Sequence, residues 1–120
     1  HNPELIVQVT NLPVDELDVD AAILFSDILM VPESMGFHVR FEESKGPIID
    51  NHLKHPSEIG NFSFSEENLN FLEPAIVELK KTLKVPLIGF TGAPFTLASY
   101  IIEGKTSRDL KTTKKWAFQD

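Results

Sequence analysis

The sequence predicts an α/β fold in which two or three parallel strands are connected by crossover helices. Two short apolar runs, 21–25 and the run that begins at Val85, lack polar alternation. That pattern is typical of strands buried on both faces of a parallel sheet. Helical patterns surround both runs, so the expected order is helix, strand, helix, an irregular connection, helix, strand, helix.

Composition limits the possible functions. The chain has 120 residues, of which 42% are hydrophobic, enough for the core of one small domain. Its formal net charge of -7 argues against a nucleic-acid partner, because phosphate binding requires a surplus of Lys and Arg. The absence of cysteine excludes disulfides and thiolate metal sites and is compatible with a cytoplasmic protein. No apolar run reaches transmembrane length, so we expect no membrane partner.

The two ends of the sequence predict a partial chain. The sequence begins with His1 rather than Met, and it reaches Asp120 within a helical pattern that includes Trp116 and Phe118. We therefore expect residues 1–120 to be an incomplete segment of a single, longer domain.

A first helix is predicted from Asn2 toward Leu17. Asn2 can cap it, and Pro3 suits the first turn, where a missing N–H costs nothing. Pro13 is expected to bend or interrupt the helix, because the ring removes one backbone hydrogen bond. Asp18 follows the helix, and Asp is one of the few residues that tolerate a left-handed backbone.

The middle of the chain is less regular. We expect a short helix over 28–35, a weak strand over 37–41, a turn over 44–47 and a loop over 50–64. A further helix is predicted to open at Ser65, which can cap it. Its core face consists of Leu69, Leu72, Ile76 and Leu79.

The last clear helix follows the second strand. Pro94 suits its first turn, and Gly104 ends it. One stripe of this helix carries Leu97, Tyr100, Ile101 and Gly104. The only tyrosine of the chain is therefore expected to face inward, near the carboxyl end of the strand, where ligands bind in α/β folds.

Residues 89–104 read Gly-Phe-Thr-Gly-Ala-Pro-Phe-Thr-Leu-Ala-Ser-Tyr-Ile-Ile-Glu-Gly. At every specified position this segment resembles the second signature of the uroporphyrinogen decarboxylase family. Residues 19–29 resemble the active-site strand of that family, and Gly46 with Pro47 resembles its next landmark. The resemblance covers essentially the whole chain. It implies a (β/α)8 TIM barrel, of which residues 1–120 supply two or three parallel strands.

The resemblance also implies a reaction. Family members are carboxy-lyases that convert the four acetate side chains of uroporphyrinogen III to methyl groups, giving coproporphyrinogen III for haem and porphyrin biosynthesis. We therefore expect a tetrapyrrole substrate, no cofactor, a cytoplasmic location and a homodimer of the full-length protein. The 120-residue fragment alone is expected to be inactive.

Asp27 is the first candidate site residue, because it places a carboxylate between the apolar runs 23–25 and 28–31. On its own it could simply cap the following helix. The resemblance implies that Asp27 is both catalytic and substrate-binding, since a carboxylate facing the pyrrole N–H groups can stabilise the cationic ring formed during decarboxylation. It further implies that Tyr100 hydrogen-bonds the substrate or Asp27 and that Phe90 forms part of an apolar wall. Without the resemblance, Tyr100 could be a core residue.

Most departures from the family pattern are absences. A substrate with eight carboxylates calls for arginines, but the chain has only Arg40 and Arg108. The arginine-rich loop of the family would lie upstream of His1, and the serine and histidine that complete its pocket would lie downstream of Asp120. The site is therefore expected to be at most half present.

Two other clusters of polar residues could be functional, but each also has a more ordinary explanation. Asp50, His52 and His55 could suggest a metal site, but they lie in a polar loop where solvated histidines are the rule, and we expect no metal. A basic patch near the end of the sequence could be a solvated helix face or could steer anions. It consists of Lys105, Arg108, Lys111, Lys114 and Lys115.

Two alternative functions stay open. One is a related barrel methyltransferase acting on corrinoid or thiol methyl groups. The other is a non-catalytic binding or scaffold domain, in which Asp27 is only a cap and Tyr100 only a core residue. The sequence lacks the GxGxxG, P-loop and GxSxG motifs, which argues against dinucleotide-binding, nucleotide-hydrolysing and α/β-hydrolase enzymes.

Overall fold

A computed structural model describes residues 2–118 of the chain. The chain divides into two compact units, each made of two separate segments. The first unit comprises His1–Ile28 and Glu66–Thr91, and the second comprises Leu29–Ser65 and Gly92–Asp120. Asp120, where the expected partial chain ends, lies outside the described residues.

The first unit contains the parallel strands that the sequence predicts. Its elements are helix α1 (Pro3–Leu17), strand β1 (Ala22–Ile23), a 3-10 turn η2 (Glu66–Leu69), helix α3 (Leu72–Thr82) and strand β4 (Leu87–Ile88). β1 and β4 pair in parallel, with Ala22 opposite Leu87 and Ile23 opposite Ile88. Both strands are shorter than expected. A mixed α/β fold with parallel strands is thus confirmed for the described residues.

Helix α1 begins and ends as its sequence predicts. The Asn2 side chain accepts a hydrogen bond from the Leu5 N–H at 3.0 Å, and Pro3 occupies the first turn. Asp18 ends the helix in a left-handed conformation with φ 50°. The expected interruption at Pro13 does not occur, because the helix continues through it to Leu17.

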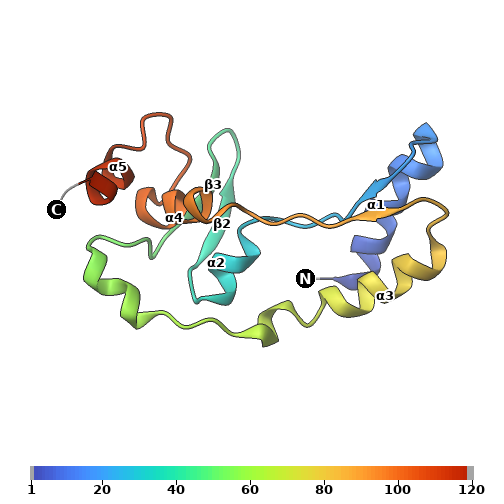
Figure 1. Cartoon of the computed structure of the whole chain (residues 1–120), viewed down its shortest axis with the longest axis horizontal. Helices are drawn as coiled ribbons and strands as arrows, with labels where there is room; N and C mark the ends of the chain where they lie inside the picture. Colours follow the sequence, from blue (N-terminus) through green and yellow to red (C-terminus); the bar gives the residue numbers. More distant parts are fainter. Residues whose placement is uncertain (1, 119–120) are drawn as a thin grey trace. The chain divides into compact units, whose positions relative to one another are not determined.

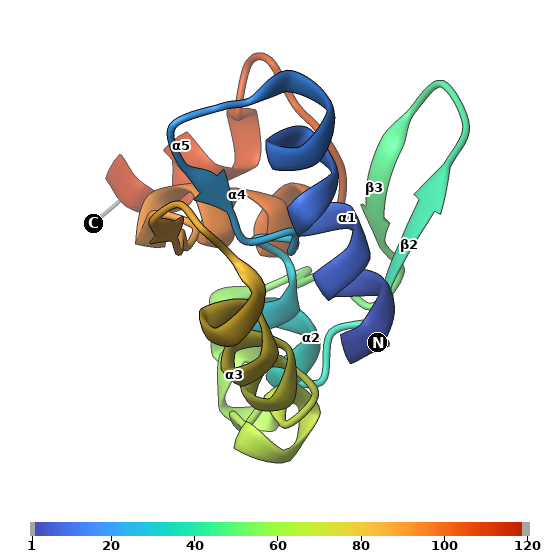
Figure 2. The same ribbon diagram turned by 90° about the vertical axis from the view of Figure 1, so that its right-hand side faces the viewer.

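The prediction that one helix opens at Ser65 is wrong. Residues 66–69 form a separate 3-10 turn, and α3 begins only at Leu72. Pro74 explains the difference: a helix from 66 would place this proline in its interior, whereas a start at Leu72 places it in the first turn. In the core of this unit α1 packs against α3, as Figures 1 and 2 show. The buried side chains of that core are Ile6, Leu24, Ala75 and Leu79.

The second unit combines a β-hairpin with short helices. Its elements are α2 (Met30–Ser34), β2 (Val39–Glu42), β3 (Gly46–Ile49), a 3-10 helix η1 (Pro56–Asn61), α4 (Pro94–Glu103) and α5 (Lys111–Phe118). β2 and β3 pair antiparallel and form the two-stranded ribbon visible in Figure 2. β3 was not predicted, and it replaces the end of the expected turn. The left-handed residues of that turn are Ser44 (φ 72°) and Gly46 (φ 78°).

The core of the second unit gathers around α4. Its buried side chains come from β3, α4 and the segments beside the hairpin, and they are Phe37, Ile49, Leu53 and Ile101. The ring of Phe37 stacks on Phe62 with 3.9 Å between ring centroids, which fixes the segment after η1 against this cluster. Tyr100 packs partly buried against the same cluster, so the expected inward face of α4 is confirmed.

Candidate active site

Asp27 and Phe90 lie beyond the carboxyl ends of two neighbouring parallel strands. β1 ends at Ile23 and β4 at Ile88, and these two residues are opposite each other in the ladder. The pairing continues past β1, where the Leu24 N–H donates to the Ile88 carbonyl at 2.9 Å. Asp27 is half-buried, and the Phe90 side chain is exposed. In parallel sheets this end is the place where catalytic residues gather.

A buried threonine holds the end of β1. Thr10 of α1 is 2% exposed, and its hydroxyl accepts a hydrogen bond from the Phe25 N–H at 3.0 Å. The bond fixes the backbone two residues before Asp27 to the first helix. Sequence reasoning missed Thr10, because a threonine in the middle of a helix gives no signal of a partner 15 residues away.

Asp27 does not occupy the N-cap position of the helix that follows it. The following helix, α2, begins at Met30, and Leu29 rather than Asp27 occupies its N-cap position. Asp27 therefore lies two residues upstream of the N-cap.

Tyr100 belongs to the second unit, on a helix whose ends are set by the two residues the sequence indicated. Pro94 occupies the first turn of α4, and Gly104 ends the helix with φ 71°. The Gly104 N–H donates to the Tyr100 carbonyl at 2.8 Å. Gly104 is required for two reasons, since a Cβ atom there would also lie 2.5 Å from Nδ1 of His52.

The carboxyl end of α4 is tied to the hairpin. Its last carbonyls would lack partners within the helix, but the Leu53 N–H donates to Ile101 at 2.9 Å and the Ile49 N–H donates to Gly104 at 2.8 Å. These bonds satisfy the helix end and place the β3 segment directly on α4. The position of Tyr100 thus depends on Ile49 and Leu53, which lie far earlier in the chain.

Glu103 fixes α4 to α5. One oxygen of its carboxylate accepts hydrogen bonds from the Thr113 N–H at 2.8 Å and from the Thr113 hydroxyl at 3.0 Å. Partial burial opposes ionisation of this carboxyl, but the donors of Thr113 and Thr112 outweigh it and lower the pKa of Glu103 below its usual value. Glu103 lies within the signature, but its role gives no local signal, because the bond depends on a helix that lies further along the chain.

A groove in the second unit, here called the Tyr100 groove, has a volume of about 250 Å³. It lies between α4 and the segment that leads to α5. Its lining residues are Phe95, Thr96, Ser99, Tyr100, Lys105, Thr106, Ser107 and Leu110. The groove shows that one side of Tyr100 is accessible, although its ring packs against the core cluster.

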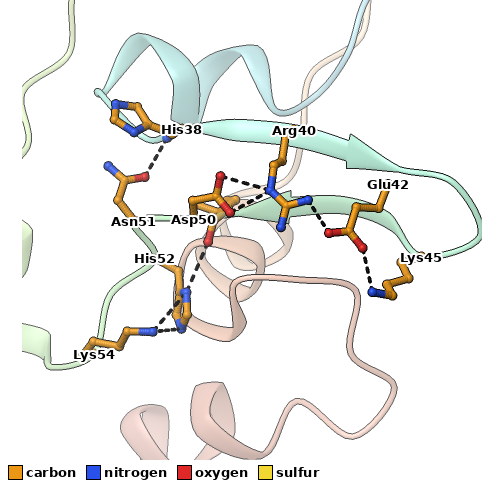
Figure 3. A network of polar contacts seen from close by, with 9 residues as sticks. His38, Arg40, Glu42, Lys45, Asp50, Asn51, His52 and Lys54 are labelled. Carbon is orange, nitrogen blue, oxygen red and sulfur yellow. Dashed lines mark hydrogen bonds and ion pairs between the residues drawn. The ribbon is translucent and has the colours of Figure 1, made fainter.

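The polar residues of the hairpin pair with one another. Figure 3 shows Arg40 between Asp50, whose Oδ1 lies 2.8 Å from the arginine Nε, and Glu42. Glu42 also pairs with Lys45 at 2.7 Å. Lys45 first and Arg40 second lower the pKa of Glu42 to about 2. Arg40, one of only two arginines, is thus engaged on an exposed hairpin.

The histidines of the neighbouring loop have structural partners. Nε2 of His52 lies 2.6 Å from the Lys54 ammonium, while Nδ1 lies 3.2 Å from the Ile49 carbonyl (Figure 3). His55 caps η1 by accepting from the Ser57 N–H at 3.3 Å. Within residues 2–118, no group of three or more His, Cys, Asp or Glu side chains is arranged to hold a metal ion. Over the same residues, no helix has the length and apolar character needed to cross a membrane.

Comparisons with known proteins agree with the signature. A sequence model of the family "Uroporphyrinogen decarboxylase (URO-D)" matches residues 1–120. The chain is 52% identical over 122 residues to a uroporphyrinogen decarboxylase of Protochlamydia amoebophila, covering 100% of this chain and 34% of the relative. It is 44% identical over 116 residues to the enzyme of that name from Neisseria meningitidis serogroup C, covering 94% and 33%. The chain therefore spans about a third of the length of these curated relatives.

A solved structure supports the fold independently. The chain resembles a methyltransferase from Methanosarcina mazei with a TM-score of 0.65 over 98% of this chain and 35% of that one. The sequences are 20% identical, so the similarity concerns the fold alone.

Proposed function

Because the chain belongs to the uroporphyrinogen decarboxylase family, we propose that it is part of an enzyme that removes carbon dioxide from the four acetate side chains of uroporphyrinogen III. The product is coproporphyrinogen III, an intermediate of haem and porphyrin biosynthesis. The observation that carries the proposal is the family match over the entire chain, together with a half-buried carboxylate beyond the end of β1. The activity belongs to the full-length protein, and the 120 residues alone are inactive.

Asp27 is the proposed catalytic and substrate-binding residue. Protonation of a pyrrole carbon gives a cationic ring that accepts the electrons released as the carboxylate departs. A fixed carboxylate facing the ring N–H groups both positions the substrate and stabilises that cation. Support comes from the two bonds that hold the preceding backbone, at Leu24 and Phe25. The proposed mechanism requires no cofactor.

Phe90 and Tyr100 complete the portion of the site present in this chain. Phe90 supplies an apolar wall, which is supported by its exposed ring beyond the carboxyl end of β4. Tyr100 donates its hydroxyl to the substrate or to Asp27, and the accessible groove along this residue supports a ligand contact.

The proposed architecture is a (β/α)8 barrel, of which residues 1–120 are an incomplete segment. β1 and β4 are neighbouring barrel strands, with α3 leading into β4. The antiparallel hairpin β2–β3 is an excursion from that pattern. The full-length enzyme is proposed to be a cytoplasmic homodimer.

A barrel methyltransferase is the second candidate, because the fold resembles such an enzyme over nearly the whole chain. The decarboxylase is preferred, since relatives of that name are 44–52% identical to this chain over 116–122 aligned residues. A binding or scaffold domain would retain the fold without turnover.

The test is decarboxylation by the full-length protein and its Asp27 variants. We expect Asp27→Ala to reduce turnover of uroporphyrinogen at least about 100-fold, the cost of removing one preorganised charge-stabilising group. Asp27→Glu should retain partial activity. Asp20→Ala is the matched control, because Asp20 is exposed and lies at the opposite, amino end of β1. Normal turnover by Asp27→Ala would refute the assignment, and methyl transfer in place of decarboxylation would favour the second candidate.

A further inference from the structure

The lining of the Tyr100 groove differs in charge from the chain as a whole. The sequence contains 18 acidic residues and carries a net charge of -7, yet no acidic residue lines the groove. The lining contains one lysine, Lys105, and five residues that carry hydroxyl groups. Phe95 and Leu110 add an apolar wall. The groove therefore combines a cation with several donors, a combination suited to an anion.

Four of these donor groups have no partner within the described part of the chain. They are the Lys105 ammonium and the hydroxyls of Thr96, Tyr100 and Thr106. The other lining groups are partly used, since the Ser99 hydroxyl donates to the Thr96 carbonyl at 2.7 Å and the Ser107 hydroxyl accepts from the Leu110 N–H at 3.1 Å.

The acidic residues nearest in sequence to Lys105 are already engaged. Glu103 accepts two hydrogen bonds from Thr113, and the Asp109 carboxylate lies 3.7 Å from Lys111. Neither is an unpaired competitor for an anion in the groove. Lys105 thus differs from Lys111, although the sequence places both in one basic patch.

The backbone that carries the groove wall is held in place. A β-bridge joins Lys105 to Ile48 of β3, and Glu103 fixes α4 to α5 on the other side. Leu110, a lining residue, has φ 49°, a conformation that costs a non-glycine residue about 1–3 kcal/mol and recurs at ligand sites. The wall is therefore preorganised before any ligand binds.

We propose that the Tyr100 groove binds one carboxylate arm of the substrate, through the Lys105 ammonium and the hydroxyls of Tyr100 and Thr106. This assignment rests on the proposed function, in which the substrate carries eight carboxylates, and it adds Lys105 and Thr106 to the site. A volume of about 250 Å³ accommodates a short acidic side chain with its waters. The lysine supplies the charge, and the hydroxyls orient the carboxylate oxygens.

The experiment uses the full-length protein with two independent readouts. One is the dissociation constant for uroporphyrin, the stable oxidised tetrapyrrole with the same eight carboxylates, measured by equilibrium fluorescence at low salt. The other is KM and kcat for uroporphyrinogen. We expect Lys105→Gln to raise the dissociation constant and KM about 10-fold and to leave kcat within about 2-fold, because the contact is present before and during the reaction.

Two variants make the result specific. Lys105→Arg keeps the charge and should restore most of the affinity, and Thr106→Val should weaken binding about 3-fold or more through loss of one donor. Lys114→Gln is the matched control, because Lys114 is an exposed lysine of α5 that does not line the groove. It should change neither constant.

The outcomes separate this proposal from the proposed function. If the protein decarboxylates uroporphyrinogen but Lys105→Gln binds uroporphyrin as tightly as the wild type, the groove assignment is overturned and the function stands. Equal losses in Lys105→Gln and Lys114→Gln would also overturn it, since they would indicate general charge attraction. If the wild type binds uroporphyrin through Lys105 without turnover, the groove assignment stands and the proposed activity fails.

Discussion

The parallel pair β1–β4 and the antiparallel pair β2–β3 are completed in different ways. Two residues of each strand pair in β1–β4, and the outer face retains apolar side chains. The exposed ones are Ile23 (62%), Phe25 (55%), Ile88 (48%) and Phe90 (47%). The hairpin pairs four residues of each strand, carries ion pairs beside one exposed apolar side chain, Phe41, and rests on α4.

The two strand pairs differ in which residues cover their faces and edges. The hairpin obtains its partners from residues nearby in sequence and from α4, so this chain is sufficient for it. The parallel pair presents apolar surface and strand edges, which in a larger sheet are covered by further strands. The proposed catalytic residue Asp27 therefore follows β1, a strand of the pair whose apolar surface is left exposed in this chain.

The largest expected contrast appears in hydrogen exchange of the isolated 120-residue chain. The Ile49 N–H, bonded to Gly104, should be protected at least about 100-fold more than the Leu24 N–H, bonded to Ile88, because local opening costs little where few contacts cover the strands. In the full-length protein the two should become similar. Equal protection in the isolated chain would contradict the comparison.

A smaller effect is expected at the junction of the hairpin with α4. Gly104→Ala should lower the free energy of unfolding by about 2–4 kcal/mol, since a left-handed alanine and a Cβ placed 2.5 Å from the His52 ring both destabilise the fold. Chemical denaturation measures this. The second substitution His52→Ala should recover part of the loss by removing the clash. Gly60→Ala, where a Cβ meets nothing within 4 Å, should be nearly neutral.

Glu103→Ala should lower the free energy of unfolding by about 1 kcal/mol, the usual loss for removing a helix cap. Glu103→Gln should lower it less, because the amide oxygen still accepts from Thr113. The folded-state pKa of Glu103 is lowered, so its contribution is complete above 4.5 and disappears as the pH falls below that value through the folded pKa. Denaturation between pH 7 and pH 3 should show a steeper decline for the wild type than for Glu103→Gln, which keeps only the contributions of the other carboxylates. A wild type and a Gln variant with parallel pH profiles would rule out this role.

The smallest effect concerns the ion pairs of the hairpin. Because Lys45 makes the largest contribution to the low pKa of Glu42, Lys45→Met should raise that pKa from about 2 toward 4.5, as measured by NMR titration of the carboxyl group. The contribution of Glu42 to stability is present above 4.5 and lost as the pH falls through about 2. The change in overall stability should be smaller than for Glu103→Ala, because the pair is exposed and screened.

Sequence reasoning succeeded where one residue type decides the local backbone. Pro94 and Gly104 gave both ends of α4, and Asn2 and Asp18 gave those of α1. These predictions depend on short-range effects of proline, glycine and capping side chains. The positions of Asp27 and Phe90 beyond parallel strands followed from the apolar runs before them.

It failed where a partner lies far along the chain. β3 was missed because Gly46 and Pro47 indicate a turn, and only pairing with β2 makes this segment a strand. The cap that Glu103 supplies to Thr113 and the close approach of His52 to Gly104 have no local signal. The place of Lys105 in the Tyr100 groove, which the other lysines of the basic patch do not line, likewise has no local signal.

The pairing of Ala22 with Leu87 also affects how the protein is made. These partners are 65 positions apart, and a ribosome adds about 5–20 residues per second. Once synthesised, β1 therefore waits roughly 3–13 s for β4, while the whole hairpin β2–β3 is completed in between. During this interval the apolar strand that precedes Asp27 has no partner strand. It is then exposed for binding by a chaperone that acts on nascent chains.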